Sequence, residues 1–357
     1  FLALGPLLGG FLTQVFSWRA VFWINFPIAL ISIILAISSV PTWRRREKLN
    51  IDYLGFFISV IFISGFVLGF MEAPNWGWTS LPIMGLFLLS IISLITFIGW
   101  EKKIPHPLVE LTLFKNLTFT TLFSVLLIIQ AVAIVFVFLA IFLQNVLHYS
   151  PLMAGLLLLP AMVPIMLMAP VGGHLRDKYG PTLPMFCGAL LVVLSLIWIA
   201  IFSHNRGYAW LFPGLLVYGI GMPLILSGIM ATVMNMVNAQ QRGMASAIFN
   251  CARQFGNTIG LALLTGLLAS VNKWQLNSFL HHSPVPLSRL KEQQIDGLLV
   301  QSDQAMKAIA HLSLAHIELL KTAALNAYTN AFSMTLLAAA ILAFLSLFLI
   351  LKIPRKQ

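Results

Sequence analysis

The sequence is poor in charged residues, and the charge that it has is unevenly divided. Charged residues make up 9% of the 357 positions, with 10 Asp and Glu against 21 Lys and Arg, whereas hydrophobic residues make up 59%. A soluble domain carries about 25% charged residues, so this chain has too few polar side chains to cover a surface in water. The composition excludes a soluble globular protein and indicates one that crosses a lipid bilayer many times.

The sequence also lacks the patterns of a disulfide framework, a metal site or a nucleic-acid surface. Its two cysteines, Cys187 and Cys251, fall in different apolar runs without metal-ligand spacing. The histidines between 271 and 327 do not place two ligands one turn apart on a helix face, which favours a solvated loop over a metal site. The net charge of +11 comes mostly from short turns between apolar runs. We therefore expect neither a metal nor a nucleic acid as a partner.

Ten apolar runs approach or exceed the roughly 20 residues that a helix needs to cross a bilayer. Their length and the lack of strict alternation favour helices over a β-barrel. We therefore predict an all-α integral membrane protein with about ten transmembrane helices, the first of them truncated. The predicted spans cover residues 1–16, 20–40, 53–71, 80–100, 118–145, 152–172, 184–203, 209–236, 244–270 and 328–351.

The distribution of Lys and Arg over the loops predicts the orientation of these spans. Thirteen cations lie on alternate turns and at the C-terminal tail, whereas the opposite short turns hold only Arg19 and Arg206. Loops rich in Lys and Arg stay in the cytoplasm, so we predict a cytoplasmic C-terminus. The long connection 271–327 then lies outside. Its second half keeps a loose helical period, which is typical of an amphipathic helix on a membrane surface.

The first apolar run carries a Pro and three Gly within six residues, Gly5, Pro6, Gly9 and Gly10. Proline removes a backbone hydrogen bond and bends a helix. Glycines four positions apart let a second helix backbone come close, as in helix packing within lipid. The run therefore predicts a bent helix, with a plain helix-packing motif as the alternative.

The residues that follow extend this pattern. Gly5-Pro6-Leu7-Leu8-Gly9-Gly10 is followed by Trp18-Arg19 and by Phe22-Trp23-Ile24-Asn25-Phe26-Pro27. Together they resemble the fifth and sixth spans of major facilitator transporters, most closely the fourteen-span drug:proton antiporters (EmrB/QacA type), where GPxxGG belongs to the antiporter motif. The resemblance implies a major facilitator fold and a C-terminal fragment that starts in the fifth span. It assigns 1–40 to the last two spans of the N-terminal six-helix bundle, 41–117 to a cytoplasmic linker and an extra two-helix insert, and 118–357 to the C-terminal six-helix bundle.

A turn on the predicted inner side reads Gly173-His174-Leu175-Arg176-Asp177-Lys178-Tyr179-Gly180. It resembles the facilitator loop signature G-x-L-x-D-R-x-G, with Lys178 where Arg is commoner. Asp177 can accept hydrogen bonds from a helix N-terminus and pair with a nearby cation, which would hold an inner gate closed. We favour this gate over a capped, solvated turn. The predicted gate residues are Gly173, Arg176, Asp177, Lys178 and Gly180.

The predicted span 244–270 carries polar side chains on a single helix face. An arginine at the depth of Arg253 costs at least about 2.5 kcal/mol unless it faces protein or water, which indicates a cavity or a helix contact. Pairing with backbone carbonyls is the alternative for Arg253, and a buried interhelical hydrogen bond is the alternative for Gln130, which lies in the middle of 118–145. The predicted substrate pathway consists of Gln130, Asn250, Arg253, Gln254 and Asn257.

The important absence is an acid within the membrane, because none of the ten Asp and Glu residues lies in the middle of a predicted span. The spans show no paired acids and no cluster of metal ligands, and there is no Gly-rich phosphate loop, so an enzyme is not expected and no catalytic residue is assigned. A proton-driven antiporter needs a membrane-buried carboxylate. The resemblance places that carboxylate in the first spans, upstream of this chain.

The function implied by the resemblance is proton-coupled efflux of amphipathic drugs across the bacterial inner membrane by alternating access. The proton gradient supplies the energy, and no cofactor is expected. A facilitator-type carrier that exports a specific metabolite or siderophore is the alternative. The expected partners are a small amphipathic substrate and the lipid bilayer, and the resemblance leaves open a periplasmic adaptor with an outer-membrane channel.

Overall fold

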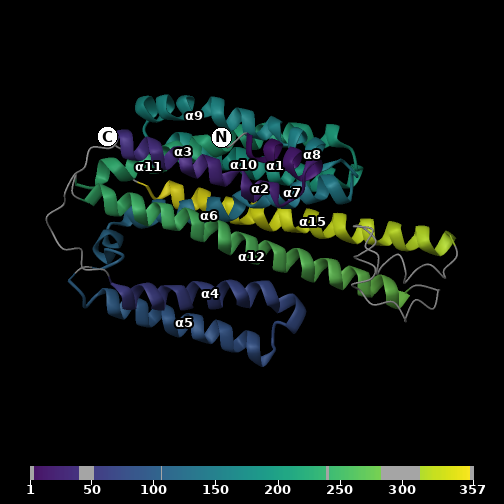
Figure 1. Ribbon diagram of the computed structural model, residues 1–357, viewed down its shortest axis with the longest axis horizontal. Coiled ribbons are helices and arrows are strands. Elements are labelled where there is room, and N and C mark those ends of the chain that lie inside the picture. The colour runs from purple at the N-terminus through teal and green to yellow at the C-terminus, as the bar shows by residue number, and fades with distance from the viewer. Residues whose placement is uncertain (1–3, 40–51, 106, 239–240, 283–313, 354–357) are drawn as a thin grey trace.

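The computed structural model describes residues 4–39, 52–105, 107–238, 241–282 and 314–353, and these residues form an all-helical fold without strands (Figure 1). Nine helical segments among them are long and apolar enough to cross a membrane. The fold class predicted from composition and run length is confirmed. The chain is a multi-pass membrane protein, because an apolar helix of this kind is stable only when lipid or protein covers it.

The described residues form the following helical elements, in chain order. The elements are α1 (Leu4–Val15), α2 (Ala20–Trp23), α3 (Asn25–Ser39), α4 (Tyr53–Trp76), α5 (Leu81–Glu101), η1 (Leu111–Lys115), α6 (Leu117–Ala133), α7 (Val135–Asn145), α8 (Pro151–Leu157), α9 (Leu159–Tyr179), α10 (Thr182–Phe202), η2 (Ser203–Asn205), α11 (Tyr208–Met236), α12 (Arg242–His282) and α15 (Leu314–Leu351). Three predicted spans are each divided into two helices, 20–40 into α2 and α3, 118–145 into α6 and α7, and 152–172 into α8 and α9.

The connection predicted at 271–327 is shorter than expected. Helix α12 continues to His282, and α15 begins at Leu314, so both helices extend into the predicted connection. The polar residues after position 270 suggested the end of a span, yet the helix persists because its inner face packs. Leu276 is fully buried, and the Asn330 side chain of α15 donates a hydrogen bond of 2.9 Å to Gln275. Of the predicted amphipathic helix, residues 283–313 lie outside the described part.

Small residues allow the bundle helices to approach at backbone distance. A Cβ atom on Gly188 of α10 would lie 2.6 Å from the Gly221 carbonyl oxygen of α11, and one on Gly221 would lie 2.7 Å from the Gly188 carbonyl oxygen. Farther along the same contact, the Ser195 hydroxyl donates 2.8 Å to the Gly214 carbonyl. This seam suits membrane helices, where small residues rather than hydrophobic burial drive close packing.

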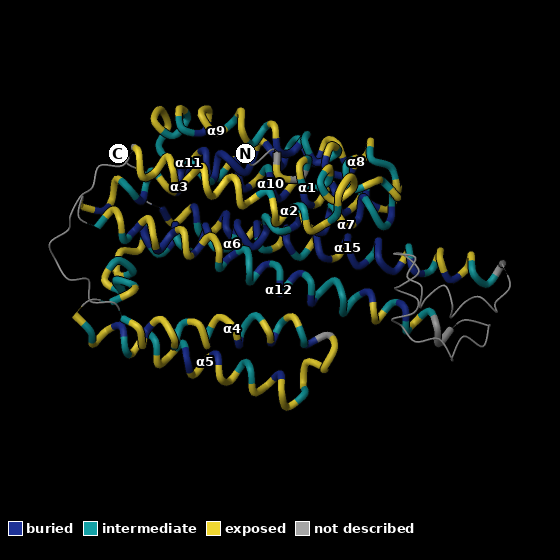
Figure 2. Tube along the Cα trace, viewed as in Figure 1, coloured by how far each residue is buried: buried dark blue, intermediate teal, exposed yellow. Residues whose placement is uncertain are grey.

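Helices α4 and α5 form a hairpin whose contact with the main bundle runs through α4 and α12 (Figure 1). The rings of Phe62 and Phe255 lie 5.6 Å apart, and the Trp78 indole donates a hydrogen bond of 3.3 Å to the Ser270 hydroxyl. Both hairpin helices are mostly exposed along their length, as Figure 2 shows. Their exposed apolar side chains are the surface that lipid covers.

Candidate functional site

The polar face of α12 is open, whereas the adjacent glycine side of the helix packs against a neighbouring helix. Asn250, Arg253 and Gln254 are exposed, and Asn257 is half-buried. Gly256 and Gly260 are buried against α6, where a Cβ on Gly256 would lie 2.5 Å from the Leu127 carbonyl oxygen. The glycine contact fixes the rotation of α12. It therefore sets the predicted polar residues on a surface that the described helices leave accessible.

Within this face, Arg253 pairs with a side chain rather than with a backbone carbonyl. One guanidinium nitrogen donates a hydrogen bond of 3.2 Å to Oδ1 of Asn250, one helical turn earlier. The backbone carbonyl of Gln254 accepts a hydrogen bond of 2.9 Å from the Thr258 hydroxyl. The side-chain amide of Gln254 has no hydrogen-bond partner among the described residues. The guanidinium has five donors, so most of its capacity remains available to a ligand or to water.

Gln130 lies apart from this open face. It is 7% exposed, and a Cβ atom on Gly256 would sit 3.0 Å from its own Cβ. The structure therefore places Gln130 in the contact between α6 and α12, beside the polar face rather than on it. A substrate contact through Gln130 would require the two helices to separate, whereas the three exposed residues need no such movement.

Among the glycines of α1, only Gly10 is at a close approach. A Cβ atom there would lie 2.9 Å from the Pro151 carbonyl carbon and 3.0 Å from the Leu152 Cα, at the start of α8. The Gln14 side chain accepts a hydrogen bond of 3.2 Å from the Leu152 amide. Gly5 and Gly9 have nothing within 4 Å of a Cβ position among the described residues. The α1–α8 contact is thus built on Gly10 and Gln14.

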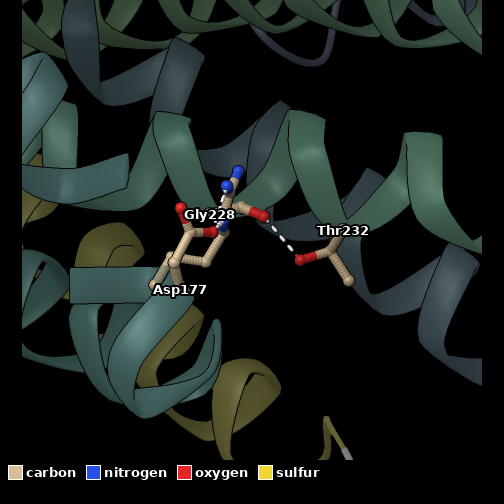
Figure 3. A network of polar contacts seen from close by, with 4 residues as sticks. Asp177, Gly228 and Thr232 are labelled. Carbon is tan, nitrogen blue, oxygen red and sulfur yellow. Dashed lines mark hydrogen bonds and ion pairs between the residues drawn. The ribbon is translucent and has the colours of Figure 1, made fainter. Parts of the chain in front are cut away.

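The predicted gate turn lies at the C-terminal end of α9. Arg176 pairs with Asp177, its neighbour in the chain, through Nε at 2.9 Å and through a guanidinium amino group. Lys178 lies 5.1 Å from the ring centre of Tyr179, and Gly180 ends the helix with a φ of +80° that favours glycine. Figure 3 shows Asp177 together with Gly228 and Thr232 of α11, where the Thr232 hydroxyl donates 2.6 Å to the Gly228 carbonyl. The described partner of Asp177 is on its own helix.

The structure brings together two acids that the sequence analysis treated as unpaired. Asp52 caps the N-terminus of α4, and Glu101 ends α5, so both lie at the same end of the hairpin. Glu101 is only 3% exposed. Both acids lie just outside the predicted spans 53–71 and 80–100, at the ends of two consecutive helices of similar length. The signal was present, since antiparallel helices place the first residue of one beside the last residue of the next.

A polar cluster at the opposite end of the bundle was also missed. The Arg206 guanidinium donates a hydrogen bond to Oδ1 of Asn326, and Nε2 of His204 lies 2.9 Å from the side-chain oxygen Oδ1 of Asn330. These contacts join the turn between α10 and α11 to α15. No motif in the sequence marked them, because the partners lie about 120 residues apart and carry common residue types.

Comparisons with known proteins agree with this architecture. Residues 1–261 match the Major Facilitator Superfamily. The chain is 30% identical over 287 residues to the multidrug resistance protein Stp of Mycobacterium tuberculosis, which covers 80% of this chain and 53% of that protein. It is 28% identical over 275 residues to the tetracenomycin C resistance and export protein of Streptomyces glaucescens, covering 75% of this chain and 50% of that protein.

A third relative aligns over nearly the whole chain. The multidrug transporter protein MdtP of Bacillus subtilis is 24% identical over 363 residues, which covers 97% of this chain and 67% of that protein. The chain spans about half the length of the first two relatives. The family match extends over most of the chain, from α1 into α12, and includes the glycine contacts described above. The chain belongs to the Major Facilitator Superfamily, a family of membrane transporters.

Proposed function

We propose that this chain forms the substrate-contacting part of an exporter that expels amphipathic compounds across the bacterial inner membrane. The observation that carries the proposal is the polar face of α12, where Asn250, Arg253 and Gln254 are exposed although they lie in a membrane span. Leaving an arginine against lipid is costly, so this face must line a water-filled or protein-lined cavity. The resistance and export functions named for its relatives suit an amphipathic substrate.

Export would follow alternating access, in which the cavity opens to one side of the membrane at a time. Two contacts described above are suited to such a movement. The α1–α8 contact at Gly10 joins helices that the family assigns to different bundles, and the Arg176–Asp177 pair lies at the end of α9. A change in either contact would alter the balance between the two conformations rather than the cavity itself.

The energy source in this proposal is the proton gradient. Arginine cannot cycle a proton because its pKa is too high. No Asp or Glu of the described residues lies in the middle of a membrane helix. We therefore propose that the coupling carboxylate belongs to an upstream span of the intact protein. Arg253 would favour the charged form of that acid across the shared cavity.

The decisive test is proton release from liposomes that contain the intact protein. Addition of an amphipathic cationic substrate should stimulate proton movement in the opposite direction, and Arg253→Gln should reduce it while the protein remains folded. The 357-residue chain alone should not transport, whereas its coexpression with a separate N-terminal half should restore export. Proton-driven export by the 357-residue chain alone would contradict the coupling part of the proposal.

The alternative is a carrier for one specific metabolite or siderophore. The same assay separates the two functions, because a drug exporter should accept several unrelated amphipathic cations, whereas a specific carrier should respond to none of them. The polar face favours neither substrate by itself, since amide and guanidinium groups bind many ligands. The names of the relatives favour the first function.

The orientation is tested separately by cysteine labelling. Arg45→Cys and Ser283→Cys would be introduced singly after replacement of the native Cys187 and Cys251, which are both exposed. An impermeant thiol reagent applied to intact cells should label position 283 alone, because the charge bias predicts that position 45 and the C-terminus face the cytoplasm. Labelling of position 45 would overturn the proposed orientation.

A further inference from the structure

Two buried carboxyl groups face each other where the α4–α5 hairpin begins and ends. Oδ1 of Asp52 accepts hydrogen bonds from the Gly55 amide at 2.9 Å and from the Trp100 indole at 3.0 Å. Oε2 of Glu101 accepts one from the Val109 amide at 3.1 Å. The remaining oxygens, Oδ2 of Asp52 and Oε1 of Glu101, are both buried and have no hydrogen-bond donor among the described residues.

These two oxygens lie against the same small residue. A Cβ atom on Gly55 would clash with Oδ2 of Asp52 and would lie 2.9 Å from Oε1 of Glu101. Glycine at this position therefore leaves space that the two carboxyl groups fill together. Two buried carboxylates this close cannot both be ionised without a large cost, and like pairs elsewhere share one proton. A proton between the two oxygens also satisfies both of them.

We infer that Asp52 and Glu101 bind one proton between Oδ2 and Oε1, and that this proton fastens the ends of α4 and α5 to each other. We place the proton on Glu101, because this side chain is almost fully buried and Oδ1 of Asp52 already accepts two N–H donors. The Glu101 hydroxyl then donates to Asp52. Within the described structure, no group of three or more His, Cys, Asp or Glu side chains surrounds the pair.

The surrounding charges do not provide another partner. Lys102 and Lys103 follow Glu101 directly, but both are exposed, and neither forms a salt bridge with Asp52 or Glu101 within the described residues. On the side of α12, Glu110 accepts a hydrogen bond of 3.3 Å from Gln241. Tyr53 beside Asp52 is exposed. Within the described contacts, neither acid forms a salt bridge with a cation.

The shared proton has a structural consequence beyond the hairpin. The Glu101 carboxyl group accepts a hydrogen bond from the Val109 amide. The residue after Val109, Glu110, accepts one from the side chain of Gln241, directly before α12. Loss of the proton would leave two negative charges facing each other. Their repulsion would separate the helix ends and would loosen this route from the hairpin to the helix that carries the polar face. A rise in pH on this side of the membrane would therefore weaken the connection.

The test is infrared spectroscopy of the purified chain in lipid nanodiscs, with a pH titration between about pH 5 and pH 9. The wild-type spectrum should contain the C=O stretch of a buried protonated carboxyl group at neutral pH, and this band should disappear at high pH. Glu101→Gln should remove the band, because its amide donates to Asp52 without a titratable proton. Glu318→Gln changes an exposed acid on α15 and should leave the band unchanged.

Thermal unfolding provides a second measurement in the same samples. The wild-type melting temperature should fall as the pH rises through the titration of the pair, because the folded state binds a proton that the unfolded state has released. In Glu101→Gln the melting temperature should depend less on pH over this range. Absence of the carboxyl band from the wild type, or its persistence in a folded Glu101→Gln variant, would overturn the inference. So would a band that sodium or magnesium ions remove at constant pH, since a cation would then be the ligand.

Discussion

Two helix pairs of similar apolar character, α10–α11 and α4–α5, are held in different ways. In the most apolar stretch of 18 residues, 50% of the residues of α10 and 56% of those of α11 are buried within the protein, against 17% in each of α4 and α5. The first pair is held by reciprocal glycine contacts within the apolar helices, at Gly188 and Gly221. The second pair has one small-residue contact, where a Cβ on Gly65 would lie 2.6 Å from the Ser90 hydroxyl, and its buried carboxyl groups lie at one end, at Asp52 and Glu101.

The difference shows that apolar character alone does not decide how a membrane helix is used. Lipid tails are as apolar as side chains, so an apolar helix gains little from leaving lipid for the bundle. What decides is whether backbones can approach and whether polar groups find partners. In the α10–α11 pair, close backbone approach extends along the contact. The α4–α5 hairpin depends more strongly on partners for its polar groups, and this predicts different responses to substitution.

The largest effect should come from breaking the glycine seam of the bundle. Gly221→Leu would drive a side chain into the Gly188 carbonyl oxygen, 2.7 Å from the Cβ position, and should destabilise the fold by at least about 2 kcal/mol. Gly85→Leu on α5 is the matched control, because nothing lies within 4 Å of its Cβ position among the described residues. Thermal unfolding followed by tryptophan fluorescence measures both variants. Equal losses of stability would contradict the comparison.

A second comparison lies within α1, where two neighbouring glycines have different surroundings. Gly10→Leu should abolish export by the intact protein, because its side chain would meet the backbone of Pro151 at the start of α8. Gly9→Leu should retain most of the export, because its Cβ position is open in the described structure. Drug resistance of cells is the readout, with membrane abundance measured by immunoblot. Loss of export in Gly9→Leu alone would show that the bend matters more than the contact.

The sequence predicts the spans and the polar face, but not which helices lie against each other. Run length and hydropathy predict the spans, because the bilayer sets the helix length. Helical spacing predicts that the polar residues of α12 share a face. Neither predicts that Gly10 has a close neighbour and Gly9 has none, because that depends on which helix lies alongside. The length of α12 depends on tertiary contacts in the same way.

An intermediate effect is expected at the end of α9. Asp177→Asn removes the charge that pairs with Arg176, and the pair is exposed enough that its loss should cost at most about 1 kcal/mol. We expect transport to slow about three- to fivefold with little change in substrate affinity, because the change affects the conformational balance and not the polar face. Transport rates and equilibrium binding in liposomes separate these quantities. An unchanged rate would leave Asp177 as a capped turn without a gating role.

The smallest expected difference between two variants tests the end of the hairpin with a pair of tryptophans. Trp100→Phe removes the indole donor that lies 3.0 Å from Oδ1 of Asp52, in a partly buried setting, whereas Trp78→Phe removes the exposed 3.3 Å hydrogen bond to Ser270. A lost hydrogen bond to a charged, desolvated acceptor costs about 1–2 kcal/mol, and an exposed one costs a few tenths because water replaces it. Trp100→Phe should therefore lower the melting temperature more than Trp78→Phe. The Trp100→Phe loss should also decrease when Asp52 is changed to Asn, because the charge that strengthens the bond is then absent. If the two tryptophan variants are equally stable, the polar end of the hairpin is not what holds α4 and α5 together, and the contrast with the glycine seam of α10 and α11 fails at that point.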